Sequence, residues 1–72
     1  MDSVAQIFDS LGGVTAVAEM LGNPLGTVSA WKTRDSIPAE HWSKLIVAAE
    51  RRGVVISYET LAKIAARRRS AA

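Results

Sequence analysis

Apolar residues recur at the spacing of an α-helix along most of the chain. The first stripe predicts a helix whose apolar face is formed by Val4, Ile7, Phe8 and Leu11. Asp2 or Ser3 can cap its start, and the Gly12–Gly13 pair ends it. The next stripe predicts a second helix over 14–21, with an apolar face formed by Val14, Val17, Ala18 and Leu21.

A third helix is expected to begin at Asn23 and Pro24. Asn is a strong N-cap, and Pro fits the first helical position because its missing N–H would have no partner there. The inner stripe of this helix is formed by Leu25, Val28 and Trp31. The remaining positions up to Thr33 form its outer and flanking faces.

The second half of the chain predicts two more helices. Pro38 stands at the first position of the fourth helix and Glu40 in its first turn, and the apolar face is formed by Trp42, Leu45, Ile46 and Ala49. Gly53 ends it, and the apolar run 54–56 is too short to assign as a strand. Ser57 caps a fifth helix, which turns Leu61 and Ile64 inward.

The predicted fold is therefore all-α, a compact bundle of four to five helices. One domain is expected over 1–66, because a chain of 72 residues is long enough for a single core and no more. The basic segment 67–72 is expected to be a disordered tail, which is either solvated or in contact with phosphates or an acidic protein.

Residues 14–33 have the spacing of a helix-turn-helix. Two short helices that cross steeply need a small residue at the crossing point, a residue that accepts positive φ at the turn, and apolar anchors on the second helix. The positions that meet these needs are Val17, Ala18, Leu21, Gly22, Val28 and Trp31. The outer face of the second helix is then free to enter a DNA major groove.

Two strings in the chain resemble known families. The run from Leu21 to Trp31, Leu-Gly-x-x-x-x-Thr-Val-Ser-x-Trp, resembles the helix-turn-helix of the phage Cro and repressor proteins. The run Trp-x-x-Arg-x-x-Ile-Pro from Trp31, followed by the aromatic Trp42, is similar to the small bacterial and prophage regulators called YdaS-like or carph-isopro proteins. The resemblance covers about residues 8–62 and implies a lambda-repressor-like fold, DNA binding and transcription regulation as a homodimer.

The chain departs from this family in the helix that would read DNA. Asn23 stands where the family has Val or Ile, so we expect the helix to start one residue early. Family members read bases with Gln, Arg or Asn, whereas the matching positions here are Leu25, Gly26 and Ala30. These residues can touch a thymine methyl group or let the backbone approach closely, but they make no bidentate contact with a base. We therefore expect modest sequence specificity and a large contribution from phosphate contacts.

The candidate DNA-binding residues fall into three groups. Thr27 and Ser29 are the candidates for groove contact, with ordinary solvated side chains as the alternative. The positions where the family meets phosphate are Lys32, Thr33 and Arg34, although Arg34 can instead pair with Asp35. The remaining candidates are Asn23 at the start of the reading helix, Thr15 at a helix N-terminus, and His41 and Lys44 on the fourth helix. For His41 and Lys44 a solvated helix face is the alternative reading.

The charge distribution supports a polyanionic partner. Residues 1–30 contain three carboxylates and no Lys or Arg, giving −3, whereas residues 31–72 contain all nine Lys and Arg against four carboxylates, giving +5. The chain has no cysteine and one histidine, so we expect no disulfide, metal or cofactor. No apolar run approaches the roughly 18 residues of a membrane span, and the acidic N-terminus is unlike a signal peptide.

The expected function is that of a non-enzymatic transcription regulator in the cytoplasm, bound to double-stranded DNA of the nucleoid. No nucleophile with a base, carboxylate pair or phosphate loop can be assembled from these residues, so no catalysis is expected. The fifth helix and the segment 54–56 are the expected homodimer surface. Two alternatives stand beside this function: a protein-interaction factor, antitoxin-like or a transcription co-activator, and a sequence-tolerant architectural DNA binder.

Overall fold

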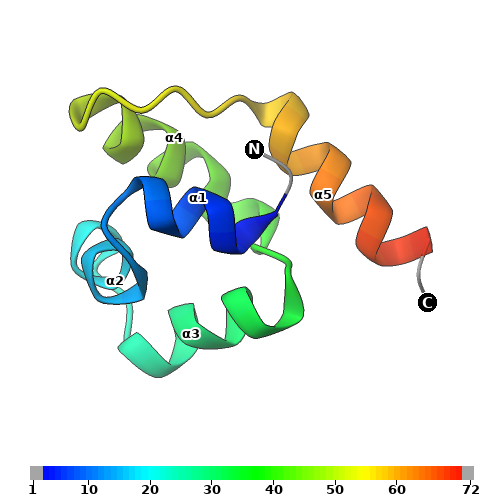
Figure 1. The fold of residues 1–72 in the computed structure, drawn as a ribbon, viewed down its shortest axis with the longest axis horizontal. Helices are drawn as coiled ribbons and strands as arrows, with labels where there is room; N and C mark the ends of the chain where they lie inside the picture. Colours follow the sequence, from blue (N-terminus) through cyan, green and yellow to red (C-terminus); the bar gives the residue numbers. More distant parts are fainter. Residues whose placement is uncertain (1–2, 71–72) are drawn as a thin grey trace.

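The computed structural model describes residues 3–70 and contains helices and loops but no strand within that range. The elements in chain order are α1 (Val4–Ser10), α2 (Val14–Leu21), α3 (Leu25–Arg34), the short 3₁₀ helix η1 (Ala39–His41), α4 (Trp42–Arg51) and α5 (Tyr58–Ser70). Figure 1 shows α1 lying across the middle of the molecule, with α3 below it, α4 behind it and α5 along one side. The predicted all-α bundle is confirmed.

Every α-helix contributes to one apolar core. Its buried side chains are Val4, Ile7, Phe8, Leu11, Val17, Ala18, Leu21, Val28, Trp31, Ile37, Leu45, Ala49, Ile56, Leu61 and Ile64. Burial of one such large apolar side chain stabilises a fold by about 1.5–3 kcal/mol. Leu25, which was expected on the inner stripe, is instead 53% exposed, because it lies in the first turn of α3 beyond the edge of this core.

Two predicted helix caps are present in the structure. The Ser3 hydroxyl accepts a hydrogen bond from the backbone N–H of Gln6 at 3.2 Å and so caps α1. The Ser57 hydroxyl accepts one from the N–H of Thr60 at 3.1 Å at the start of α5. Asp2, the other candidate cap for α1, lies outside the described residues.

The predicted cap at Asn23 is wrong. Helix α3 begins at Leu25, and Pro24 precedes it with an extended ψ of 143°. The N–H of Asn23 bonds back to the carbonyl oxygen of Ala18 at 3.1 Å, so Asn23 closes the end of α2 after the left-handed Gly22. The side chain makes no cap, and its Oδ1 is buried with no hydrogen-bond partner among residues 3–70.

The start of α4 and the end of α5 also differ from expectation. Pro38, with ψ of 137°, precedes η1 instead of opening the fourth helix, and α4 begins at Trp42. The Trp42 indole N–H donates to the carbonyl oxygen of Ile37 at 2.8 Å and closes this irregular entry. Residues 67–70, expected to belong to a disordered tail, are instead the last turn of α5. Residues 71–72 lie outside the described part of the chain.

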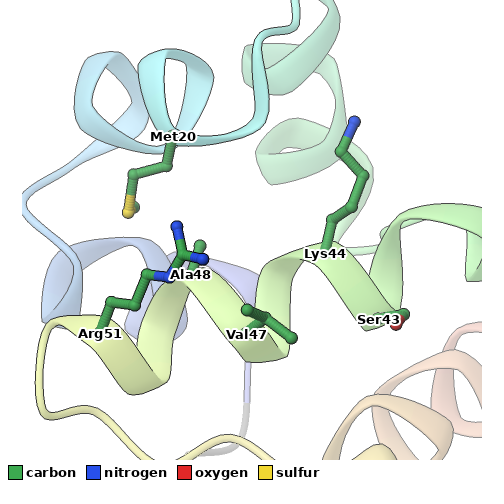
Figure 2. Close-up of a pocket in the computed structure, with 6 residues that line it drawn as sticks. All are labelled: Met20, Ser43, Lys44, Val47, Ala48 and Arg51. Carbon is green, nitrogen blue, oxygen red and sulfur yellow. The ribbon is translucent and has the colours of Figure 1, made fainter.

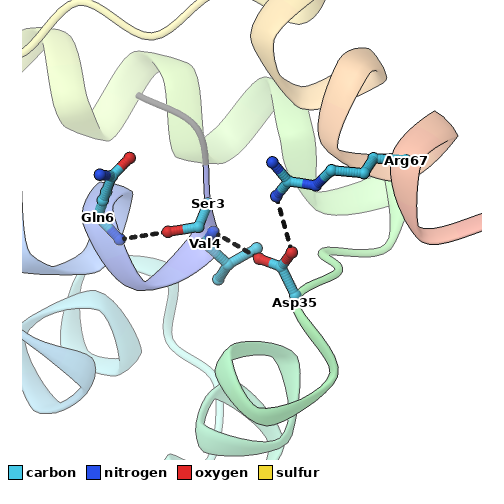
Figure 3. Close-up of polar contacts among 5 residues, drawn as sticks. All are labelled: Ser3, Val4, Gln6, Asp35 and Arg67. Atoms are coloured by element: carbon cyan, nitrogen blue, oxygen red, sulfur yellow. Dashed lines mark hydrogen bonds and ion pairs between the residues drawn. The ribbon is translucent and has the colours of Figure 1, made fainter. Parts of the chain in front are cut away.

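Asp35 connects three helices at the end of α3. Its backbone is left-handed, with φ of 53°, a conformation that Asp tolerates better than most residues. One carboxylate oxygen accepts the N–H of Val4 at 2.9 Å, at the start of α1, where the helix dipole favours a negative charge. The other oxygen accepts from Arg67 of α5 at 2.9 Å. Figure 3 shows both contacts converging on this one side chain.

No single helix within residues 3–70 has the length and apolar character of a membrane span. Helices α1 and α2 reach that length and character only when they are taken together, across a bend of 80°.

The substitution Asn23→Val is expected to raise the free energy of unfolding by about 1 kcal/mol, because it removes a buried polar atom that has no partner. Urea denaturation of the two chains measures the difference. A loss of stability would show instead that the Asn23 amide makes a hydrogen bond in solution.

The substitution Asp35→Ala is expected to lower the free energy of unfolding by about 2 kcal/mol, since it leaves the N–H of Val4 without its acceptor and strains a left-handed residue. Asp35→Asn keeps a side-chain oxygen and loses only the charge, so it should lower the free energy of unfolding by less than about 1 kcal/mol. Arg67→Ala removes the other member of this partly exposed ion pair, and its effect should be equally small. Equal costs for the two Asp35 variants in urea denaturation would rule out a contribution from the bond to Val4.

Candidate nucleic-acid interface

Helices α2 and α3 form a helix-turn-helix unit with a buried seam. Val17, Ala18 and Leu21 of α2 are buried, as are Val28 and Trp31 of α3. Gly22 ends α2 with φ of 69°, a left-handed conformation in which a residue without Cβ is favoured. The apolar residues of the predicted motif core are therefore buried between the two helices, and the glycine lies at the turn. Val28 and Trp31 fix the face of α3 that points inward.

The opposite face of α3 is open to solvent. Its exposed residues are Leu25, Gly26, Thr27, Ser29, Lys32, Thr33 and Arg34, and Ala30 is half-buried. All eight were predicted as DNA contacts, and the structure brings them together on one helix of ten residues. In Figure 1, α3 lies at the lower edge of the molecule with no other helix below it.

The hydroxyl groups on this face differ in their availability. Thr33 donates its hydroxyl to the carbonyl oxygen of Ser29 at 3.2 Å, one turn earlier, so its proton is already used. The hydroxyls of Thr27 and Ser29 have no partner among residues 3–70. Each of these two side chains is therefore free to donate a hydrogen bond to, and accept one from, a ligand that lies against α3.

The last turn of α3 carries the positive charge of the site. Lys32 and Arg34 are both exposed and form no ion pair with the described residues. The alternative in which Arg34 pairs with Asp35 is not found in the structure, where the Asp35 carboxylate accepts from Val4 and Arg67. These two cations are therefore available to a phosphate group.

Gly26 stands in the first turn of α3 without a structural reason in the free protein. A Cβ built at this position meets no atom within 4 Å, and its backbone is helical with negative φ. Glycine in a helix typically costs roughly 0.5–1 kcal/mol relative to alanine. A glycine on an exposed helix face allows a ligand to approach the backbone closely.

The other predicted contacts lie away from the outer face of α3. Thr15 is exposed in the first turn of α2, where Gly13 provides no side-chain cap. His41 is half-buried, and its ring packs on Trp31 with centroids 4.7 Å apart, a contact that the sequence pattern did not indicate. Lys44 is exposed on α4, where it lines a groove together with Met20 and Arg51. The sequence pattern gave no indication of this groove.

The residues described hold no group of three or more His, Cys, Asp or Glu side chains that could bind a metal ion. Comparison of the chain with protein-family models, with curated proteins and with solved structures finds no match. The chemistry of the site comes from its own residues: two free hydroxyls, two free cations and a glycine, which are spread around the exposed side of α3.

Proposed function

We propose that this chain is a DNA-binding transcription regulator that inserts α3 into the major groove of double-stranded DNA. The proposal rests mainly on the exposed polar face of α3, which is held outward by the buried Val28 and Trp31. The sequence resemblance to Cro and repressor proteins and to the small prophage regulators agrees with it.

The residues of α3 divide into two roles in this proposal. Thr27 and Ser29 reach base edges, where a hydroxyl can donate or accept, and Gly26 lets the backbone come close. Lys32 and Arg34 neutralise phosphates at the far end of the helix. Lys32 and Arg34 are the side chains on this face that could contact a guanine through two hydrogen bonds, and the proposal assigns both to phosphates. Phosphate contacts therefore supply most of the affinity.

A second copy of the chain is part of this proposal. A single small module buries only about 600–1,000 Å² of protein surface on DNA, which limits its affinity. Val55 is 85% exposed and Tyr58 is 56% exposed where the α4–α5 loop meets α5, and these apolar groups would be covered in a dimer. Two copies would then contact half-sites about one helical turn apart.

Thr27→Ala is expected to relax sequence preference, whereas Arg34→Ala is expected to weaken binding to all duplexes alike and to reduce the salt slope by about one. The preferred site is first selected from a random duplex library. Each variant is then titrated against that site and a scrambled duplex at two salt concentrations.

Lys63→Ala removes an exposed cation from α5 and serves as the control for Arg34→Ala. The native chain should prefer its selected site by at least about 10³. A steep salt slope without any preference would identify an architectural binder instead. Absence of binding to both duplexes at micromolar protein would overturn DNA binding altogether.

Gly26→Ala is expected to stabilise the free protein slightly, by up to about 0.5 kcal/mol, and to weaken DNA binding by about tenfold, since the added methyl group points into open space until DNA occupies it. Thermal denaturation and duplex titration give the two quantities. Gln6→Gly, at an exposed position of α1 that the proposal does not use, should lower stability and leave affinity unchanged. Unaltered affinity of Gly26→Ala would place DNA away from the start of α3.

A further inference from the structure

An open groove of about 300 Å³ lies between α2 and α4, and no residue of α3 lines it. Its lining residues are Met20, Ser43, Lys44, Val47, Ala48 and Arg51. Figure 2 shows Met20 extending from α2 towards α4, with Val47 and Ala48 lying between Lys44 and Arg51 on α4. The row on α4 therefore has apolar side chains in its middle and begins and ends with a cationic residue, with the Arg51 side chain extending towards Ala48.

The spacing on α4 places these residues on one face. Lys44, Val47, Ala48 and Arg51 follow the i, i+3, i+4, i+7 pattern. The backbone positions of Lys44 and Arg51 are two helical turns apart, about 10.5 Å along the axis. Val47 between them is 47% exposed, so its side chain is available for contact with an apolar group of a ligand.

The two cations have no partner within the described part of the chain. Neither Lys44 nor Arg51 forms an ion pair or hydrogen bond there, although other cations do: Lys63 pairs with Glu59 and Arg67 with Asp35. Glu50 lies on the flank of the same helix, by its position one residue before Arg51. A negatively charged ligand is therefore favoured along the face of α4 that carries Lys44 and Arg51, and it is disfavoured on the flank that carries Glu50.

We propose that this groove binds an acidic amphipathic helix of a partner protein. Two carboxylates seven residues apart on that helix would lie against Lys44 and Arg51, and apolar side chains between them would cover Met20 and Val47. The complementarity is in both charge and spacing, since the partner helix has the same rise per residue as α4. The groove contains no residue of α3, the helix proposed to enter the DNA major groove.

A DNA backbone matches the groove less well than an acidic helix does. Phosphates would pair with the two cations, but the sugar-phosphate strand between them would cover Met20 and Val47 with polar groups and gain little from their burial. An acidic helix uses both features of the groove, the charged ends and the apolar middle.

The test is a ¹⁵N and methyl NMR titration of the whole chain, without DNA, with a synthetic helical peptide. The peptide carries two Glu residues seven apart, Leu three and four positions after the first Glu, and Ala elsewhere; its counterpart has Lys in place of Glu. With about 1 mM acidic peptide, shift changes are expected at the groove residues and at the Met20 methyl group, and the Lys peptide should produce none.

Charge reversal provides the sharper comparison. The double variant Lys44→Glu/Arg51→Glu should bind the acidic peptide at least about tenfold more weakly and should gain binding to the Lys peptide. Lys63→Glu, on α5, should change neither affinity by more than about twofold. The substituted side chains are exposed, and a native circular-dichroism spectrum confirms that each variant is folded.

Three results would overturn the proposal. The first is the absence of shift changes at the groove with acidic peptide. The second is unaltered peptide binding by the double variant together with a loss of duplex affinity, which would make the groove a phosphate-binding surface. The third is a changed monomer–dimer equilibrium of the double variant without any change in peptide binding, which would assign the groove to a second copy. The first and third of these results do not depend on whether α3 binds DNA.

Discussion

The burial of the Trp31 indole beneath α3 is the constraint on which the candidate interface depends. Trp31 and Val28 occupy the inner face of the helix, and the ring of His41 lies against the indole. A helix whose inner face is fixed in this way has only one orientation left for its polar face, which is outward. Truncation of a buried indole typically costs about 3–5 kcal/mol, a large share of the stability of a domain of this size.

Much of this architecture follows from the sequence, because periodicity and local chemistry act over a few residues. The buried positions of α1, α2 and α5 match their apolar stripes, and the seam between α2 and α3 matches the motif spacing. The outward face of α3 was predictable for the same reason. The role of Asn23 was not predictable from the sequence, because this residue lies between two helices. Its backbone N–H closes the end of α2, whereas its side chain does not cap α3. Local propensity does not decide between these two roles.

The features that sequence reasoning missed join residues far apart in the chain. Asp35 contacts Val4 and Arg67, which are 31 and 32 residues away, and no periodic pattern encodes such a contact. His41 was a candidate phosphate contact, with a solvated helix face as the alternative, yet the fold places its ring on Trp31. The α4 groove likewise needs Met20 from α2 to complete it. Pairings of this kind depend on tertiary packing, which a single sequence does not reveal.

The position of Asp35 midway along the chain has a consequence for the order in which the molecule is completed. Its carboxylate accepts one hydrogen bond from Val4, near the start of the chain, and one from Arg67, near its C-terminal end. A chain is synthesised from the first residue onward. The contact between Asp35 and Arg67 therefore stays incomplete until the last turn of α5 has been translated.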